Sequence, residues 1–139
     1  MKEVFVDTGY FVATLHQRDQ LHSRALEEGR RAVRSRLVTT DFVLIELLTF
    51  FAEYGREPRA AAARTVDAWR ANPSVLVIAA SRVGFLKALA RYRERADKGY
   101  SLTDCHSMLV MEERGITETL SPDEHFEQAG FRALLRDRA

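Results

Sequence analysis

The chain has 139 residues, a length typical of one domain with a substantial buried core. Its 46% apolar and 29% charged residues are ordinary for a globular protein and exclude a disordered chain as the default. No apolar run approaches the roughly 20 residues that span a bilayer, no basic-then-apolar leader opens the sequence, and the single Cys105 cannot form an internal disulfide. We therefore expect a single cytoplasmic domain over residues 1–139 that does not enter a membrane.

The net charge of +1 is the sum of acidic and basic residues that we expect to be unevenly distributed over the protein. Four acidic residues, discussed below, are predicted to share one site, and without them 21 basic residues face 16 acidic ones, a balance of +5. Eighteen of the basic residues are Arg, whose planar guanidinium binds phosphate well. This is weak support for a nucleic-acid partner, because abundant Arg and Ala are also typical of a GC-rich genome.

Hydrophobic periodicity alternates between short strands and helices along the chain. Turn and cap residues set the predicted boundaries. We expect strands at 3–7, 37–39, 75–79 and 116–120. We expect helices at 8–16, 19–36, from the cap Thr40 to Tyr54, at 59–71, 82–95 and 102–114, and a short one around 131–135. Asp19 is expected to cap the helix at 19–36, and Ser101 or Thr103 the helix at 102–114; the apolar side of the helix at 19–36 is expected to comprise Leu21, Ala25, Leu26, Ala32 and Val33.

Strands separated by helices imply parallel pairing through right-handed crossovers. We therefore expect the α/β class, as a three-layer α/β/α sandwich with a central, mainly parallel sheet. This excludes the aspartic proteases, which share the Asp-Thr-Gly spelling of residues 7–9 but are almost entirely β. In an open parallel sheet, ligands bind beyond the carboxyl ends of the strands, and Asp7 is predicted to stand at one such end.

Four acidic residues occupy positions that suit a shared site. Asp7 ends the first buried strand in VFVDTGYF, and Asp123 in LSPDEHF follows the last strand at the same edge. Glu46 interrupts the apolar run FVLIELLTFF, so its stem lies on or beside a buried helix face. Asp104 in YSLTDCHS stands in the first turn of a helix, where the helix dipole favours a negative charge. Each residue alone has a plain structural explanation as a cap, a turn residue or the partner of an Arg.

Taken together, the four acids predict a metal site. Carboxylates gathered at one rim repel one another, and each raises the pKa of its neighbours. Mg²⁺ or Mn²⁺ relieves that repulsion, because these hard cations prefer oxygen ligands. A metal-activated water can then hydrolyse a phosphodiester.

Other chemistries have little support in the sequence. There is no phosphate-cradling glycine motif, and Cys105 is expected to pack as a small buried side chain. The histidines show no spacing typical of a zinc site and are expected to be surface or structural residues: His16, His22, His106 and His125.

With these residues identified, the sequence resembles the PIN-domain family, specifically the VapC-like ribonuclease toxins of prokaryotic toxin–antitoxin pairs. Five strings carry the resemblance in order over nearly the whole chain: FVDTGYFVA, DQLHSRA, TTDFVLIEL, DKGYSLTDCHS and LSPDEHFEQAGF. The resemblance implies an α/β/α sandwich and a Mg²⁺- or Mn²⁺-dependent endoribonuclease. It also implies an RNA substrate, a cognate antitoxin and a homodimer.

We accordingly predict that Asp7 and Asp104 are the principal metal ligands and that Glu46 and Asp123 hold or activate water. Aromatic candidates for dimer contacts, each of which could equally belong to the core, are Phe50, Phe51, Tyr54 and Trp69. Basic candidates for holding the RNA backbone are Arg56, Arg59, Arg91, Arg93, Arg95 and Lys98.

The chain departs from the family pattern at three places. Gly9 replaces a small hydroxyl residue often found two positions after the first aspartate. Ser121-Pro122 stands where a Thr and usually an aromatic residue are expected, although Ser121 keeps a hydroxyl. Asp97 is a spare acid that could compete with Asp123 for a place in the site.

Alternative functions stay open at this point. One is a PIN-type RNA-processing nuclease that is not a toxin, and another is an inactive module that binds RNA or a partner. A third is an aspartyl phosphatase with Asp7 as nucleophile, although such enzymes usually carry a second acid where this chain has Gly9.

Overall fold

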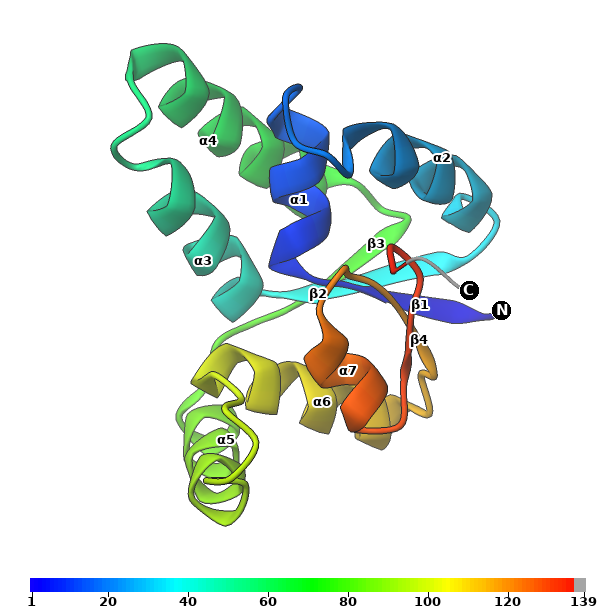
Figure 1. The fold of residues 1–139 in the computed structure, drawn as a ribbon, viewed down its shortest axis with the longest axis vertical. Coiled ribbons are helices and arrows are strands. Elements are labelled where there is room, and N and C mark those ends of the chain that lie inside the picture. The colour runs from blue at the N-terminus through cyan, green and yellow to red at the C-terminus, as the bar shows by residue number, and fades with distance from the viewer. Residues whose placement is uncertain (137–139) are drawn as a thin grey trace.

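The computed structural model describes residues 1–136, and that part of the chain contains one five-stranded sheet and seven helices (Figure 1). The elements, in chain order, are β1 (Glu3–Val6), α1 (Thr8–Leu15), α2 (His22–Ala32), β2 (Arg36–Thr40), α3 (Asp41–Phe51), α4 (Arg56–Ala71), β3 (Val75–Ile78), α5 (Arg82–Glu94), α6 (Leu102–Arg114), β4 (Glu118–Leu120), α7 (Glu124–Gln128) and β5 (Arg132–Ala133).

The strand order β3-β2-β1-β4-β5, with every pair parallel, explains the layers of the fold. From β1 through β2 to β3 the chain moves one way across the sheet, and right-handed crossovers place α1 to α4 on one face. From β3 it returns past β1 to β4, so the same handedness places α5 and α6 on the opposite face. Figure 1 shows these two groups of helices on opposite sides of the strands. The predicted α/β/α sandwich is confirmed, and its sheet is wholly parallel.

The direction of the crossovers reverses between β1 and β4, which pair side by side with Val6 opposite Leu120. At such a switch point the connections leave toward opposite faces and open a crevice beyond the carboxyl ends of the strands. Asp7 directly follows β1, and Ser121 directly follows β4. The topology therefore brings two residues 114 positions apart to the same crevice.

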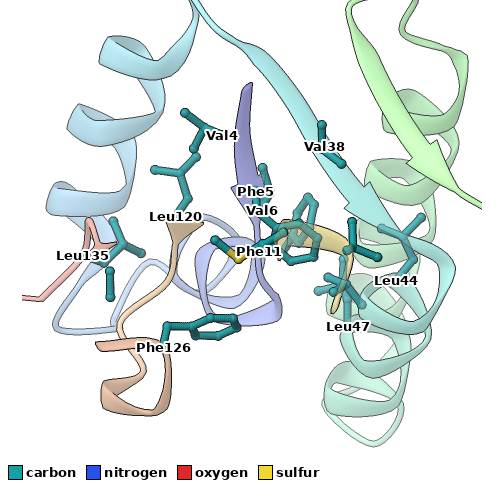
Figure 2. Packing of buried hydrophobic residues seen from close by; sticks show 14 of the residues in the cluster. Val4, Phe5, Val6, Phe11, Val38, Leu44, Leu47, Leu120, Phe126 and Leu135 are labelled. Carbon is teal, nitrogen blue, oxygen red and sulfur yellow. The ribbon is translucent and has the colours of Figure 1, made fainter. Parts of the chain in front are cut away.

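Helices on both faces bury the central strand completely. Val4, Phe5 and Val6 of β1 are each at most 2% exposed, which accounts for the continuous apolar run in the sequence. Figure 2 shows labelled side chains from α1, α3 and α7 gathered around β1, β2 and β4. Leu135 joins the same core from beyond β5.

Hydroxyl caps begin the helices that border the crevice. The Thr40 side chain accepts a hydrogen bond from the backbone N–H of Val43 at the start of α3, as predicted. Ser101, rather than Thr103, caps α6, and Asp104 completes a reciprocal capping box. Gly115 ends α6 in a left-handed conformation with φ 68°.

The predicted helix at 131–135 is wrong. Asp123 caps a shorter and earlier helix, α7, and Gly130 with φ 96° turns the chain out of it. The segment after Gly130 then pairs in parallel with β4 as the edge strand β5. A two-residue strand has no readable periodicity, so its apolar neighbours resembled a helix in the sequence.

The predicted helix at 19–36 is too long at both ends. Asp19 makes a turn by accepting from the N–H of Leu21, so it does not cap α2, and Arg36 already belongs to β2. Leu26 and Val33, assigned to the apolar side, are 40% and 76% exposed. Of the predicted apolar side, Ala25 and Ala32 are buried and Leu21 packs against the core.

None of the helices formed by residues 1–136 has the length and apolar character needed to cross a bilayer.

The Thr40 cap provides a test of the local architecture at the start of α3. Thr40→Val keeps the shape of the buried side chain but removes the acceptor for the N–H of Val43, so we expect the free energy of unfolding to fall by about 1 kcal/mol. Thr40→Ser, which retains the hydroxyl, is the matched control and should lose less. Urea denaturation measures both, and equal stability of the Val variant and the wild type would contradict the cap.

Candidate active site

The carboxylate of Asp7 is fixed by the strand beside it. Asp7 is 6% exposed, and its Oδ2 accepts a hydrogen bond of 2.9 Å from the hydroxyl of Ser121. The same hydroxyl accepts from the backbone N–H of Asp123 at 3.1 Å. Ser121 therefore joins the ends of β1 and β4, and the polar role expected of a hydroxyl at this position is present.

Glu46 enters the same crevice from the middle of α3. Its Oε1 accepts a 2.6 Å hydrogen bond from the hydroxyl of Thr8, the first residue of α1. The side chain is half-buried, between the buried Val43 on one side and the exposed Phe50 on the other. The bond to Thr8 orients this carboxylate next to Asp7.

Asp104, Asp123 and His125 lie close enough together to hold one metal ion. Each offers one ligand atom, and these atoms lie within 4.8 Å of one another. Nδ1 of His125 lies 3.1 Å from Oδ2 of Asp104 and 3.4 Å from Oδ1 of Asp123. Oδ2 of Asp104 also accepts from the backbone N–H of Ser101, which holds the carboxylate at the start of α6.

The four predicted acids meet in one pocket of about 350 Å³. Within residues 1–136, no Lys or Arg side chain lines it, and His125 is the one lining side chain that could carry a positive charge beside the four carboxylates. The lining residues are Asp7, Thr8, Gly9, Glu46, Gly99, Ser101, Asp104, Pro122, Asp123 and His125.

The pKa of Asp7 reflects its burial and the neighbouring carboxylates. Burial, reinforced by the negative charges of Asp104 and Glu46, raises this pKa to about 7 from an ordinary value near 3.8. The hydrogen bond from Ser121 acts in the opposite direction but does not cancel the effect of burial. A buried carboxylate in this state favours either a proton or a bound cation.

The donor set fits a hard divalent cation. Carboxylate oxygens dominate the pocket, and Mg²⁺ and Mn²⁺ prefer oxygen ligands. A bound ion would offset the repulsion that the unneutralised carboxylates now carry. The imidazole of His125 adds a nitrogen that suits Mn²⁺ better than Mg²⁺ if it reaches the ion.

Comparison with known proteins assigns the chain to a family. The model of the PIN domain matches residues 4–132, which is nearly the whole chain. The chain belongs to the PIN domain family. A comparison with curated proteins finds no match.

One similar solved structure is the crystal structure of Mycobacterium tuberculosis VapC20, described as a toxin that cleaves the sarcin–ricin loop. It is 27% identical in sequence, and the match covers 92% of this chain and 95% of that one, with a TM-score of 0.77. The likeness therefore extends over nearly the whole of both chains.

Sequence reasoning missed two residues of this PIN pocket that are not acidic, Thr8 and His125. Thr8 orients Glu46, and its hydroxyl gave no separate signal as a site residue. His125 was assigned to structural histidines, but it lies in the pocket. Its place two residues after Asp123 in LSPDEHF was the available signal.

The remaining candidates lie outside the pocket. His22 contacts the carbonyl oxygen of Ala13 at 2.7 Å, and His106 is buried against the ring of Phe42. Cys105 is buried, as expected. Asp97 is exposed, pairs with Lys98 and does not line the acidic pocket.

Two departures from the family pattern are in contact with each other. A Cβ atom on Gly9 would lie 2.5 Å from Cδ and 2.9 Å from Cγ of Pro122. The proline ring therefore fills the space that a side chain at position 9 would need. Gly9 and Pro122 together shape the wall of the pocket between Asp7 and Asp123.

The raised pKa of Asp7 predicts how the stability of the metal-free protein depends on pH. Between about pH 4, the ordinary carboxyl value, and about pH 7, the folded-state value, the folded protein keeps a proton that the unfolded chain has released. The folded state binds more protons over this interval, so stability should fall as the pH rises. Urea denaturation in EDTA across this interval measures the slope.

Asp7→Asn cannot ionise and is the control for this prediction. Its stability should depend less on pH than that of the wild type over the same interval. Identical slopes for the two proteins would show that Asp7 titrates normally in the folded state.

The contact between Gly9 and Pro122 predicts a coupled pair. Gly9→Ser should stabilise the first turn of α1 by a few tenths of a kcal/mol if helix propensity alone decided, but the contact with the proline ring should make the change destabilising. Pro122→Ala removes the ring, so the double variant should recover part of the loss, with a coupling of about 0.5–3 kcal/mol. Denaturation of the wild type, both single variants and the double variant measures it, and strictly additive effects would refute the contact.

Proposed function

We propose that this PIN-domain protein is a Mg²⁺- or Mn²⁺-dependent endoribonuclease and the toxin of a toxin–antitoxin pair. The observation that carries the proposal is the convergence of Asp7, Glu46, Asp104 and Asp123 on one pocket that no Lys or Arg of residues 1–136 lines. The full-length likeness to a VapC toxin that cleaves RNA supports the same reaction class. Cytoplasmic location and a cognate antitoxin belong to this proposal.

In the proposed mechanism the acids divide into pairs. Asp7 and Asp104 would hold the ion, since both are buried and have fixed orientations. Glu46, which accepts from Thr8, and Asp123 would orient the water. When bound, a divalent ion lowers the pKa of a water nucleophile and neutralises charge at the leaving oxygen.

The residues around these carboxylates supply preorganisation. Ser121 keeps Oδ2 of Asp7 turned toward β4, and Ser101 keeps Asp104 at the first turn of α6. His125 borders both Asp104 and Asp123, so it limits how far their carboxylates can move apart. Such supporting groups commonly affect activity by fixing the ligands they touch.

Two alternatives lose support on the same geometry. An aspartyl phosphatase would need a second acid near position 9, and Pro122 occupies that space. An inactive binding module gives no reason for four carboxylates to be oriented into one pocket. An RNA-processing nuclease that is not a toxin would use the same site, and the genetic context distinguishes it.

Homodimerisation stays a prediction. Of its four aromatic candidates, Phe51 is buried and Trp69 packs against the core, so they are not free for contacts between subunits. Phe50 and Tyr54, at 40% and 50% exposure, stack on each other and present an apolar surface at the end of α3. These two are the candidates that the fold leaves available.

Cleavage of RNA by purified protein tests the reaction. Wild type with Mg²⁺ or Mn²⁺ should cleave RNA, whereas Asp7→Asn, or wild type in excess EDTA, should not. Ser121→Ala should lose about 10- to 100-fold in activity, because the orientation of Asp7 relaxes. Gel analysis of labelled RNA measures each rate.

Asp97→Asn is the matched control, since it removes an exposed carboxylate outside the pocket and should keep wild-type activity. Undiminished cleavage by Asp7→Asn would refute the site, and undiminished cleavage in EDTA would refute the metal. The toxin role is supported if expression of wild type arrests growth, Asp7→Asn does not, and a short DNA-binding protein is encoded immediately upstream.

A further inference from the structure

A second pocket adjoins the acidic one at the connection between α5 and α6. It has a volume of about 580 Å³ and is lined by Tyr92, Arg93, Arg95 and Tyr100, among others. We call it the Tyr92 pocket. It combines aromatic rings with guanidinium groups, which is the chemistry that binds single-stranded nucleic acid.

The two pockets are contiguous. Gly99 and Ser101 line both of them. Tyr100 lies between these two residues, and its ring packs edge-on against the ring of His125 with centroids 5.3 Å apart. The two pockets therefore border each other along residues 99–101.

Charge favours an RNA strand as the occupant. The acidic pocket repels phosphates, and no Lys or Arg of residues 1–136 lines it to hold the phosphates next to the one that reacts. Arg93 and Arg95 are exposed, and within the described part of the chain neither side chain makes a hydrogen bond or ion pair. Arg95 acts on the carboxylate of Glu112 only through space, so both guanidinium groups can bind phosphate beside the acidic pocket.

The neighbouring cations differ in this respect. Arg91 is engaged by the carboxylate of Glu112, and Lys98 pairs with Asp97. Two acids of the same segment, Glu94 and Asp97, do not line the Tyr92 pocket. Of the predicted RNA-binding candidates on this segment, the structure thus leaves Arg93 and Arg95 both unpaired and facing a pocket.

Tyr92 provides a free aromatic face. Its side chain is 49% exposed, and within residues 1–136 its ring contacts no other ring. By contrast, the similarly exposed Tyr54 stacks on Phe50. Stacking of a base on an exposed tyrosine tolerates any base sequence, because every base has a π face.

We propose that the Tyr92 pocket binds the nucleotide next to the scissile phosphodiester of single-stranded RNA, with its base on Tyr92 and its phosphates on Arg93 and Arg95. The inference rests on the proposed ribonuclease function and adds to it the place where a flanking nucleotide is held.

Binding of short RNA tests the pocket independently of cleavage. The protein carries Asp7→Asn to prevent turnover, and fluorescence anisotropy follows its binding to fluorescein-labelled octaadenylate and octauridylate in Mg²⁺ at several KCl concentrations. Tyr92→Leu should weaken binding roughly 5- to 150-fold without changing the salt dependence. The loss should be larger for octaadenylate, because adenine stacks more strongly.

The arginine variants should give a different signature. Arg93→Gln/Arg95→Gln should reduce the slope of log affinity against log salt concentration by about 1.4, since each phosphate contact on a single strand contributes about 0.7. Phe85→Leu and Arg30→Gln, an exposed aromatic residue and an exposed arginine outside both pockets, are the matched controls and should bind as the parent does. Melting temperatures establish that every variant is folded.

The outcomes separate this inference from the proposed function. If wild type cleaves RNA while the pocket variants bind and cleave like the controls, or if neither oligonucleotide binds, the Tyr92 pocket is not an RNA site. If the variants lose binding to a purified antitoxin but keep RNA binding, the pocket belongs to the protein partner and the inference is overturned. If wild type fails to cleave but RNA binding still depends on Tyr92, the ribonuclease proposal fails and the RNA site stands.

Discussion

The pairing of β1 with β4 is the constraint on which the site depends. Because the crossovers reverse direction between these two strands, their carboxyl ends open into one crevice, and Asp7 and Ser121 meet across it at 2.9 Å. The helices that follow are placed by the same reversal. α3 reaches the crevice from one face of the sheet with Glu46, and α6 reaches it from the other with Asp104.

The carboxylates that converge there repel one another, and the surrounding residues offset only part of this repulsion. Thr8, Ser101 and Ser121 each donate a hydrogen bond to one of the carboxylates, but no Lys or Arg of the described residues lines the pocket to remove the net charge. Burial of Asp7, together with the charges of Asp104 and Glu46, raises its pKa to about 7. Such a site favours a bound proton or divalent ion, and the arginines suited to a nucleic acid lie beside it rather than within it.

Much of this arrangement could be predicted from the sequence, because buried strands and capped helices leave strong local patterns. The strands around β1, the caps Thr40 and Ser101, and the four acids are examples. The strand after Gly130 could not be predicted, since a two-residue edge strand exists only through its pairing with β4. Likewise, the roles of Thr8 and His125 depend on contacts between distant segments, and the periodicity within one segment does not reveal such contacts.

The packing of Gly9 against Pro122 bears on how relatives of this protein are recognised. Judged one position at a time, the chain carries two mismatches to the family pattern beside its first and last acidic residues. Sterically the two changes are one, because the ring of Pro122 fills the volume that a side chain at position 9 would occupy. A sequence profile that scores each position independently counts this coupled change as two mismatches. It would therefore give too low a score to homologues that carry the same pair of residues.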